Sequence, residues 1–134
     1  MKNFDRDTMT RRFEECPVIH LTSKDRSAVF TEVSEWFPEY ITFPASEIAA
    51  DSAALDGQSK EQVRFMSDKY SKPEDLLILS LSPEETADKK HVEYWVFITM
   101  LYRKALKHPT VVITEVPFSH EIFVKQICAP VSAD

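Results

Sequence analysis

Glycine is almost absent from this sequence, with Gly57 as the single example among 134 residues. Loops that wrap phosphate groups need glycine, because only a residue without a side chain lets the backbone approach the ligand closely. The sequence therefore holds no P-loop, no dinucleotide-binding fingerprint and no kinase-type glycine-rich loop. These absences exclude the commonest routes to nucleotide chemistry, and we expect no cofactor.

Cysteine and paired histidines are also scarce. Cys16 and Cys128 are far apart and belong to no CxxC or Cys/His cluster. We expect both to be free thiols that pack as small apolar side chains. No two of the histidines have the spacing of a metal site on a helix, so we predict no metal. The histidines are His20, His91, His108 and His120.

Long apolar runs are missing as well. The longest covers residues 94–98, whereas a membrane-spanning helix needs about 20 apolar residues. The first 15 residues are charged and lack the apolar segment of a signal peptide. We therefore predict a cytoplasmic protein without a membrane partner.

Acidic residues outnumber basic ones by 22 to 16, for a net charge of −6. This balance argues against a nucleic-acid partner, since phosphate contacts need clustered Lys and Arg. It is compatible with a basic protein partner. Small size, negative charge and the lack of a catalytic motif favour a protein-interaction module of the inhibitor, immunity or chaperone-like kind.

The apolar pattern predicts one α/β domain over residues 1–134, with 1–16 as an N-terminal arm or short helix. Short buried runs at 18–21, 40–43, 76–79 and 111–114 indicate four strands. Helical spacing covers 23–36, 45–55, a stretch from 59, 83–107 and a short stretch from 119. Strands that alternate with helices predict a mostly parallel sheet in a three-layer sandwich, with a flavodoxin-like or Rossmann-like topology. The position of the second strand stays open.

Ligands of open parallel sheets bind beyond the carboxyl ends of the strands. If the chain is an enzyme, an imidazole and a carboxylate near hydroxyl groups there would do acid–base work, which assigns catalysis to His20, Glu115 and His120. The alternative is that the hydroxyl residues cap helices and His20 points into the core. The predicted ligand-binding residues are Thr22, Ser23, Ser80, Ser82 and Ser119.

One part of the sequence resembles a known family. Residues 75–78, a helix that contains Glu93, and residues 104–113 resemble the second half of nucleoside deoxyribosyltransferase-like domains. The resemblance implies a functional role for Glu93 and a nucleoside-related ligand. Bulky residues at 94–97 stand where that family has small ones.

Residues 92–102 are apolar nearly all round the predicted helix, whereas a surface helix normally has one apolar stripe. A second side of this helix must therefore be covered by the N-terminal arm, a neighbouring helix, a protein partner or a second copy of the chain. The interface predicted on it consists of Tyr94, Trp95, Phe97, Met100 and Leu101. An interaction module that uses this helix is the favoured hypothesis. The alternative is a small enzyme or ligand-binding domain with its site at the strand ends.

Overall fold

The computed structural model describes residues 4–118, 127 and 129–134. In this part of the chain five strands form one all-parallel sheet in the order β2-β3-β4-β1-β5. The final helix predicted from residue 119 falls outside the described residues. The strands are β1 (Val18–Thr22), β2 (Tyr40–Ile41), β3 (Leu76–Leu81), β4 (Thr110–Thr114) and β5 (Val131–Ser132).

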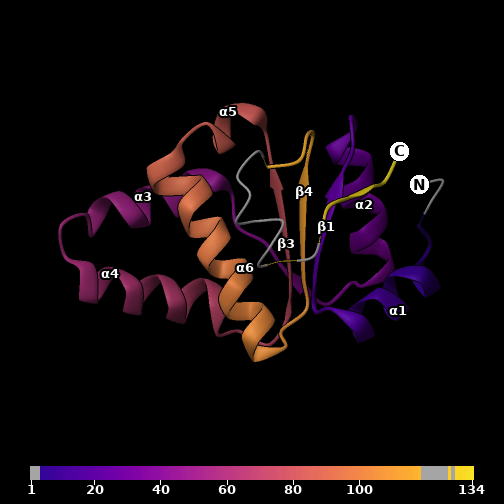
Figure 1. The fold of residues 1–134 in the computed structure, drawn as a ribbon, viewed down its shortest axis with the longest axis horizontal. Helices are drawn as coiled ribbons and strands as arrows, with labels where there is room; N and C mark the ends of the chain where they lie inside the picture. Colours follow the sequence, from indigo (N-terminus) through magenta and orange to yellow (C-terminus); the bar gives the residue numbers. More distant parts are fainter. Residues whose placement is uncertain (1–3, 119–126, 128) are drawn as a thin grey trace.

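Helices cover both faces of the sheet (Figure 1), which confirms the predicted three-layer α/β sandwich. Helices α1 (Arg6–Glu15) and α2 (Arg26–Trp36) lie on one face. Helices α3 (Ala45–Ala54), α4 (Ser59–Met66) and α6 (Tyr94–Leu106) lie on the other side. The strand order differs from those of the flavodoxin and Rossmann folds, with which the sheet shares its parallel strands and its two helical layers.

The side chains of each strand alternate between two separate cores, because successive residues of a strand point to opposite faces. Leu77, Leu79 and Val112 pack under α6. Ile78 and Val111 pack under α1 and α2. Which side of the sheet a polar side chain occupies therefore follows from its position in the strand.

Helix α2 begins later than the predicted residue 23. Asp25, rather than Thr22 or Ser23, is its N-cap, and the Asp25 carboxylate accepts a hydrogen bond from the Ala28 backbone N–H at 3.1 Å. Residues 23–25 are therefore free to form a loop at the end of β1.

The predicted helix over 83–107 is broken into three parts. It starts as expected, because Ser82 and Glu85 form a capping box before α5 (Pro83–Thr86). A new helical segment begins after Asp88, whose carboxylate accepts a hydrogen bond from the His91 backbone N–H at 3.0 Å. A π-helical turn, η2 (Lys89–Glu93), then leads into α6. A second π-helical turn, η1 (Ser67–Ser71), extends α4.

The predicted frayed tail after residue 130 is wrong. Residues 131–132 form β5 alongside β1, and the Ala133 N–H donates to the Thr22 carbonyl at 2.8 Å. The Asp134 carboxylate accepts hydrogen bonds from the Ser23 hydroxyl at 2.6 Å and from the Lys24 N–H at 3.2 Å. These bonds hold the end of the chain against the loop that follows β1.

The prediction that Cys16 is a free thiol is wrong, because Cys16 is disulfide-bonded. Cys128, for which the same was predicted, lies outside the described residues. Disulfides persist mainly in oxidising compartments, so the cytoplasmic location stays a prediction. Among the described residues, no helix combines the length and the apolar character that crossing a membrane requires.

Candidate functional site at the carboxyl edge

The carboxyl ends of all strands lie at one edge of the sheet, since every pair is parallel. β4 lies between β3 and β1. The chain leaves β1 toward α2, which packs on one face, and leaves β4 toward Phe118, which packs in the core on the other face. Neighbouring strands whose connections diverge in this way form the switch point at which parallel sheets bind ligands.

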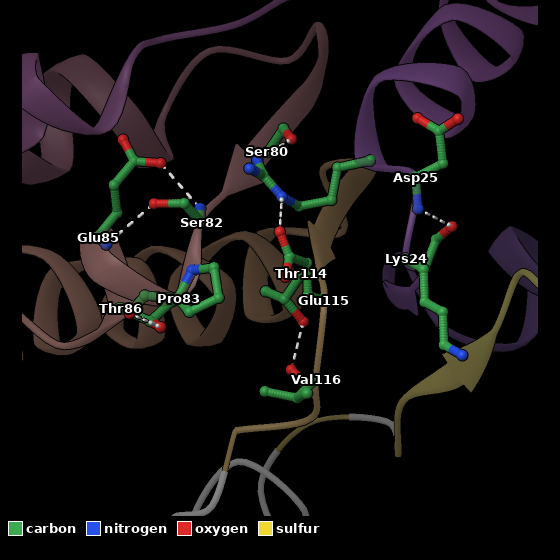
Figure 2. A network of polar contacts seen from close by, with 12 residues as sticks. Lys24, Asp25, Ser80, Ser82, Pro83, Glu85, Thr86, Thr114, Glu115 and Val116 are labelled. Atoms are coloured by element: carbon green, nitrogen blue, oxygen red, sulfur yellow. Dashed lines mark hydrogen bonds and ion pairs between the residues drawn. The ribbon is translucent and has the colours of Figure 1, made fainter.

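Arg26, at the start of α2, links the ends of β3 and β4 at this point. One terminal nitrogen of its guanidinium donates to the Ser80 hydroxyl of β3 at 2.9 Å, and its Nε lies 3.4 Å from Oε1 of Glu115, directly after β4. The Arg26 side chain is 24% exposed and that of Glu115 is 40% exposed. We name these three residues the Arg26 cluster. Figure 2 shows Ser80 and Glu115 between the Ser82 capping box on one side and Lys24 with Asp25 on the other.

The Arg26 cluster presents oriented polar groups to solvent. Glu115 is held through one carboxylate oxygen, and its other oxygen has no hydrogen-bond partner among the described residues. An oriented carboxylate can accept two hydroxyl protons of one ligand. A guanidinium beside it can donate to a ligand oxygen. The arrangement suits the binding of a small molecule with neighbouring hydroxyl groups.

His20 lies on the opposite side of the sheet from the Arg26 cluster. It pairs with Val112 and shares the α6 face, while Ser80 pairs with Ile113 on the α2 face. The His20 side chain is buried, and its Nε2 lies 2.8 Å from Oγ1 of Thr114. That hydroxyl donates its proton to the Val116 carbonyl at 2.6 Å, so Nε2 of His20 must be the donor.

The imidazole of His20 is also unsuited to acid–base catalysis near neutral pH. Burial lowers the pKa of His20 to about 4, so the ring is neutral at pH 7. Its ring lies 4.8 Å from that of Phe118, centroid to centroid. The structure thus places His20 in the core, which matches the alternative reading of this residue.

The hydroxyl residues predicted to bind ligand have mixed positions. Ser80 belongs to the Arg26 cluster. Ser23 donates to Asp134, Ser82 is the N-cap of α5, and Thr22 is the last residue of β1. Of the predicted site residues that the structure describes, Ser80 and Glu115 are brought together, through Arg26. Ser119 and His120 lie outside the described residues.

The predicted interface residues lie mostly inside the domain. Trp95, Phe97 and Met100 are buried in the core that α6 forms with the sheet. Leu101 is half-buried, and Tyr94 is 51% exposed. A partner can therefore reach Tyr94 and part of Leu101, whereas the other three side chains are covered by the chain itself.

Glu93, the residue singled out by the family resemblance, closes the turn η2. Its carboxylate forms an ion pair with Lys89 at 2.7 Å. The sequence did not predict a nearby polar cluster of Ser52, Gln62 and His91. Oγ of Ser52 lies 2.7 Å from Nδ1 of His91, and the Gln62 amide donates to the Ser52 carbonyl at 2.8 Å. These residues line a cavity of about 290 Å³ between α3, α4 and η2.

Within the described residues, no group of three or more His, Cys, Asp or Glu side chains is arranged to hold a metal ion. Comparisons of the chain with protein-family models, with curated proteins and with solved structures find no match.

Proposed function

We propose that this chain is a small-ligand-binding domain whose site lies at the carboxyl edge of the sheet and takes a molecule with neighbouring hydroxyl groups. The Arg26 cluster carries the proposal, because it gathers a guanidinium, a hydroxyl and a carboxylate at the switch point between β1 and β4.

Nucleosides are the first ligands to test. Their ribose carries two adjacent hydroxyl groups, which fit the oxygen of Glu115 that is not used by Arg26. The sequence resemblance to nucleoside deoxyribosyltransferase-like domains points to the same class. The shortage of glycine argues against a phosphate-wrapping loop, so the recognised part is the sugar rather than a phosphate chain.

The test compares adenosine with 2′-deoxyadenosine, which lacks one of the two hydroxyl groups, by NMR titration of the labelled protein. Adenosine should shift the backbone signals of residues 26, 80 and 115 and bind at least about fivefold more tightly, the worth of one hydrogen bond. The Glu115→Gln variant should erase this difference.

Glu74→Gln is the matched control. Glu74 is exposed, and no ion pair involving it is found in the described residues. It stands just before β3, at the opposite edge of the sheet. The control should keep the preference for adenosine. Adenosine shifts confined to other residues, or an unchanged preference in Glu115→Gln, would show that the carboxyl edge does not bind the sugar.

A protein-interaction module is the second candidate, and one observation favours it. An apolar stripe follows the outer face of α6, formed by Tyr94, Ile98, Leu101, Tyr102 and Leu106. Tyr94, Tyr102 and Leu106 are exposed. A stripe that is apolar along its whole length is self-complementary, so the partner we propose for it is a second copy of the chain.

Analytical ultracentrifugation between about 1 and 100 µM tests this candidate. A dimer that dissociates in the Leu106→Glu variant would support it, whereas a monomer at the highest concentration would remove it. The Val63→Glu variant is the control, because Val63 is a comparably exposed apolar residue on α4.

A further inference from the structure

The largest cavity that we describe lies at the other end of the sheet. It has a volume of about 490 Å³ and adjoins Leu76, the first residue of β3, and Pro109, which precedes β4. These residues mark the amino ends of the strands, so the cavity is distinct from the Arg26 cluster. Its volume falls in the range of small-molecule sites, about 300–1,000 Å³.

Three aromatic side chains form much of its wall. Phe13 comes from α1, while Trp36 and Phe37 come from the end of α2. The rings of Phe13 and Phe37 meet edge to face, with centroids 5.9 Å apart. Pro38 follows at once in the wall and turns the chain away from α2. The two helices therefore pack their aromatic rings against each other and present one aromatic wall to the cavity.

Arg6 adds a positive charge to this aromatic wall. Its guanidinium carbon lies 5.8 Å from the centroid of the Phe37 ring, and its Nε donates to the Trp36 carbonyl at 3.4 Å. These two contacts place the guanidinium beside the aromatic wall. Its terminal nitrogens have no acceptor among the described residues, which leaves them for an anion.

Glu39 is the one acidic side chain in the wall, and within the described part of the chain it forms no ion pair with Arg6. Glu39 and Arg6 are both exposed, so water screens both charges. The cationic group that is fixed against the aromatic wall is that of Arg6.

We propose that this cavity binds a planar aromatic carboxylate, with the ring packed on the wall of Phe13, Trp36 and Phe37 and the carboxylate on Arg6. Aromatic walls favour planar ligands, because their edges and faces interact favourably with a ring. A carboxylate matches the two terminal nitrogens of a guanidinium, which donate in parallel. The site stands independently of the carboxyl edge.

Isothermal titration calorimetry with two probes tests the proposal. The first probe is 2-naphthoate, and the second is 2-naphthalenemethanol, a neutral molecule of nearly the same shape. The wild-type protein should bind 2-naphthoate in a 1:1 complex, and about tenfold more tightly than the alcohol, because the carboxylate adds a charge-assisted contact.

Arg6→Gln should remove that preference, weakening 2-naphthoate about tenfold and the alcohol less than twofold. Arg11→Gln is the matched control, since Arg11 is exposed on the same helix, does not line the cavity and carries the same charge. Glu39→Gln should leave 2-naphthoate binding equal to or tighter than in the wild type.

Three results would overturn the proposal. The first is no binding of either probe at millimolar concentration. The second is an equal loss in Arg6→Gln and Arg11→Gln, which would reveal a general charge effect. The third is 2-naphthoate binding that survives Phe13→Ala, a change that removes one aromatic wall. Failure of this proposal would not affect the outcome of the nucleoside titration, because the NMR signals followed in that titration come from residues at the opposite edge of the sheet.

Discussion

Replacing Arg103 with methionine should destabilise the domain more than any other single change discussed above. Arg103 lies in α6 and is fully buried, yet no carboxylate pairs with it in the described structure. Burial lowers the pKa of Arg103 to about 10, so it remains a cation at pH 7. Its guanidinium instead donates to the Thr110 hydroxyl and to the backbone carbonyls of Tyr70, Ser71, Pro73, Asp75 and Pro109.

The magnitude follows from the acceptors that the change would leave behind. The bonds to the Pro73 and Asp75 carbonyls are the shortest to the backbone, at 2.7 and 2.5 Å. A buried carbonyl that loses its donor costs about 1–3 kcal/mol. Two such carbonyls cost about 2–6 kcal/mol, and relief of the desolvation of the buried cation reduces this to a net loss of about 1–4 kcal/mol. A domain of this size is stable by about 5–15 kcal/mol in total.

Urea unfolding followed by circular dichroism measures this loss. Arg103→Lys should also be strongly destabilised, because an ammonium group has three donors and cannot reach acceptors spread around a planar fork. Arg11→Met, on the exposed face of α1, is the control and should stay within about 0.5 kcal/mol of the wild type. A loss below about 1 kcal/mol in Arg103→Met would refute the reasoning.

Three further predictions concern stability. Burial lowers the pKa of His20 from 6.5 to about 4, so the unfolded chain binds the proton more readily than the folded chain does. The free energy of unfolding should therefore have its full value above about pH 6.5 and should fall by up to about 3 kcal/mol toward pH 4. Urea midpoints measured across that range should show a weaker pH dependence in His20→Gln. Lys107 ends α6 with a φ of 60°, a left-handed conformation that glycine adopts without strain, so Lys107→Gly should raise the free energy of unfolding by about 0.5–1 kcal/mol in urea titrations. Ser82→Ala removes the N-cap of α5 and should lower the free energy of unfolding by about 1 kcal/mol, whereas Ser34→Ala on α2 should change that free energy little.

The layered fold could be predicted because each main strand is a short apolar run. The runs at 18–21, 76–79 and 111–114 all became strands, and most of the chain between them is helical, as the alternation of strands and helices predicted. β5 could not be predicted in this way. It contains two residues, Val131 and Ser132, and depends on contacts with β1 that lie more than 100 positions away.

The role of Arg103 was also hidden from the sequence. A basic residue near the carboxyl end of a helix normally faces solvent and interacts with the helix dipole. Burial of Arg103 depends on the carbonyls of 70–75, which the turn η1 brings to it. That turn is π-helical, and the apolar pattern of α4 gives no sign of it.

The position of Arg26 in the sequence contains a signal from which its acidic partner could have been predicted. It stands in the first turn of α2, where a cation is disfavoured by the helix dipole. A cation at that position, one short loop after a buried strand, indicates an acidic partner on a neighbouring strand. Glu115 was already placed at the same edge, so the pair could have been proposed from the sequence.

The alternation of side chains along the strands divides the predicted site into two parts. Ser80 and Glu115 face the α2 side with Arg26, while His20 faces the α6 side with Thr114. Catalysis that shares a proton between His20 and Glu115 would therefore have to cross the sheet, which the buried β4 blocks. The other polar groups at this edge serve the fold, since Ser82 caps a helix and Ser23 holds Asp134. Among the polar groups that the structure describes at this edge, those of the Arg26 cluster are oriented toward solvent, where a ligand can reach them.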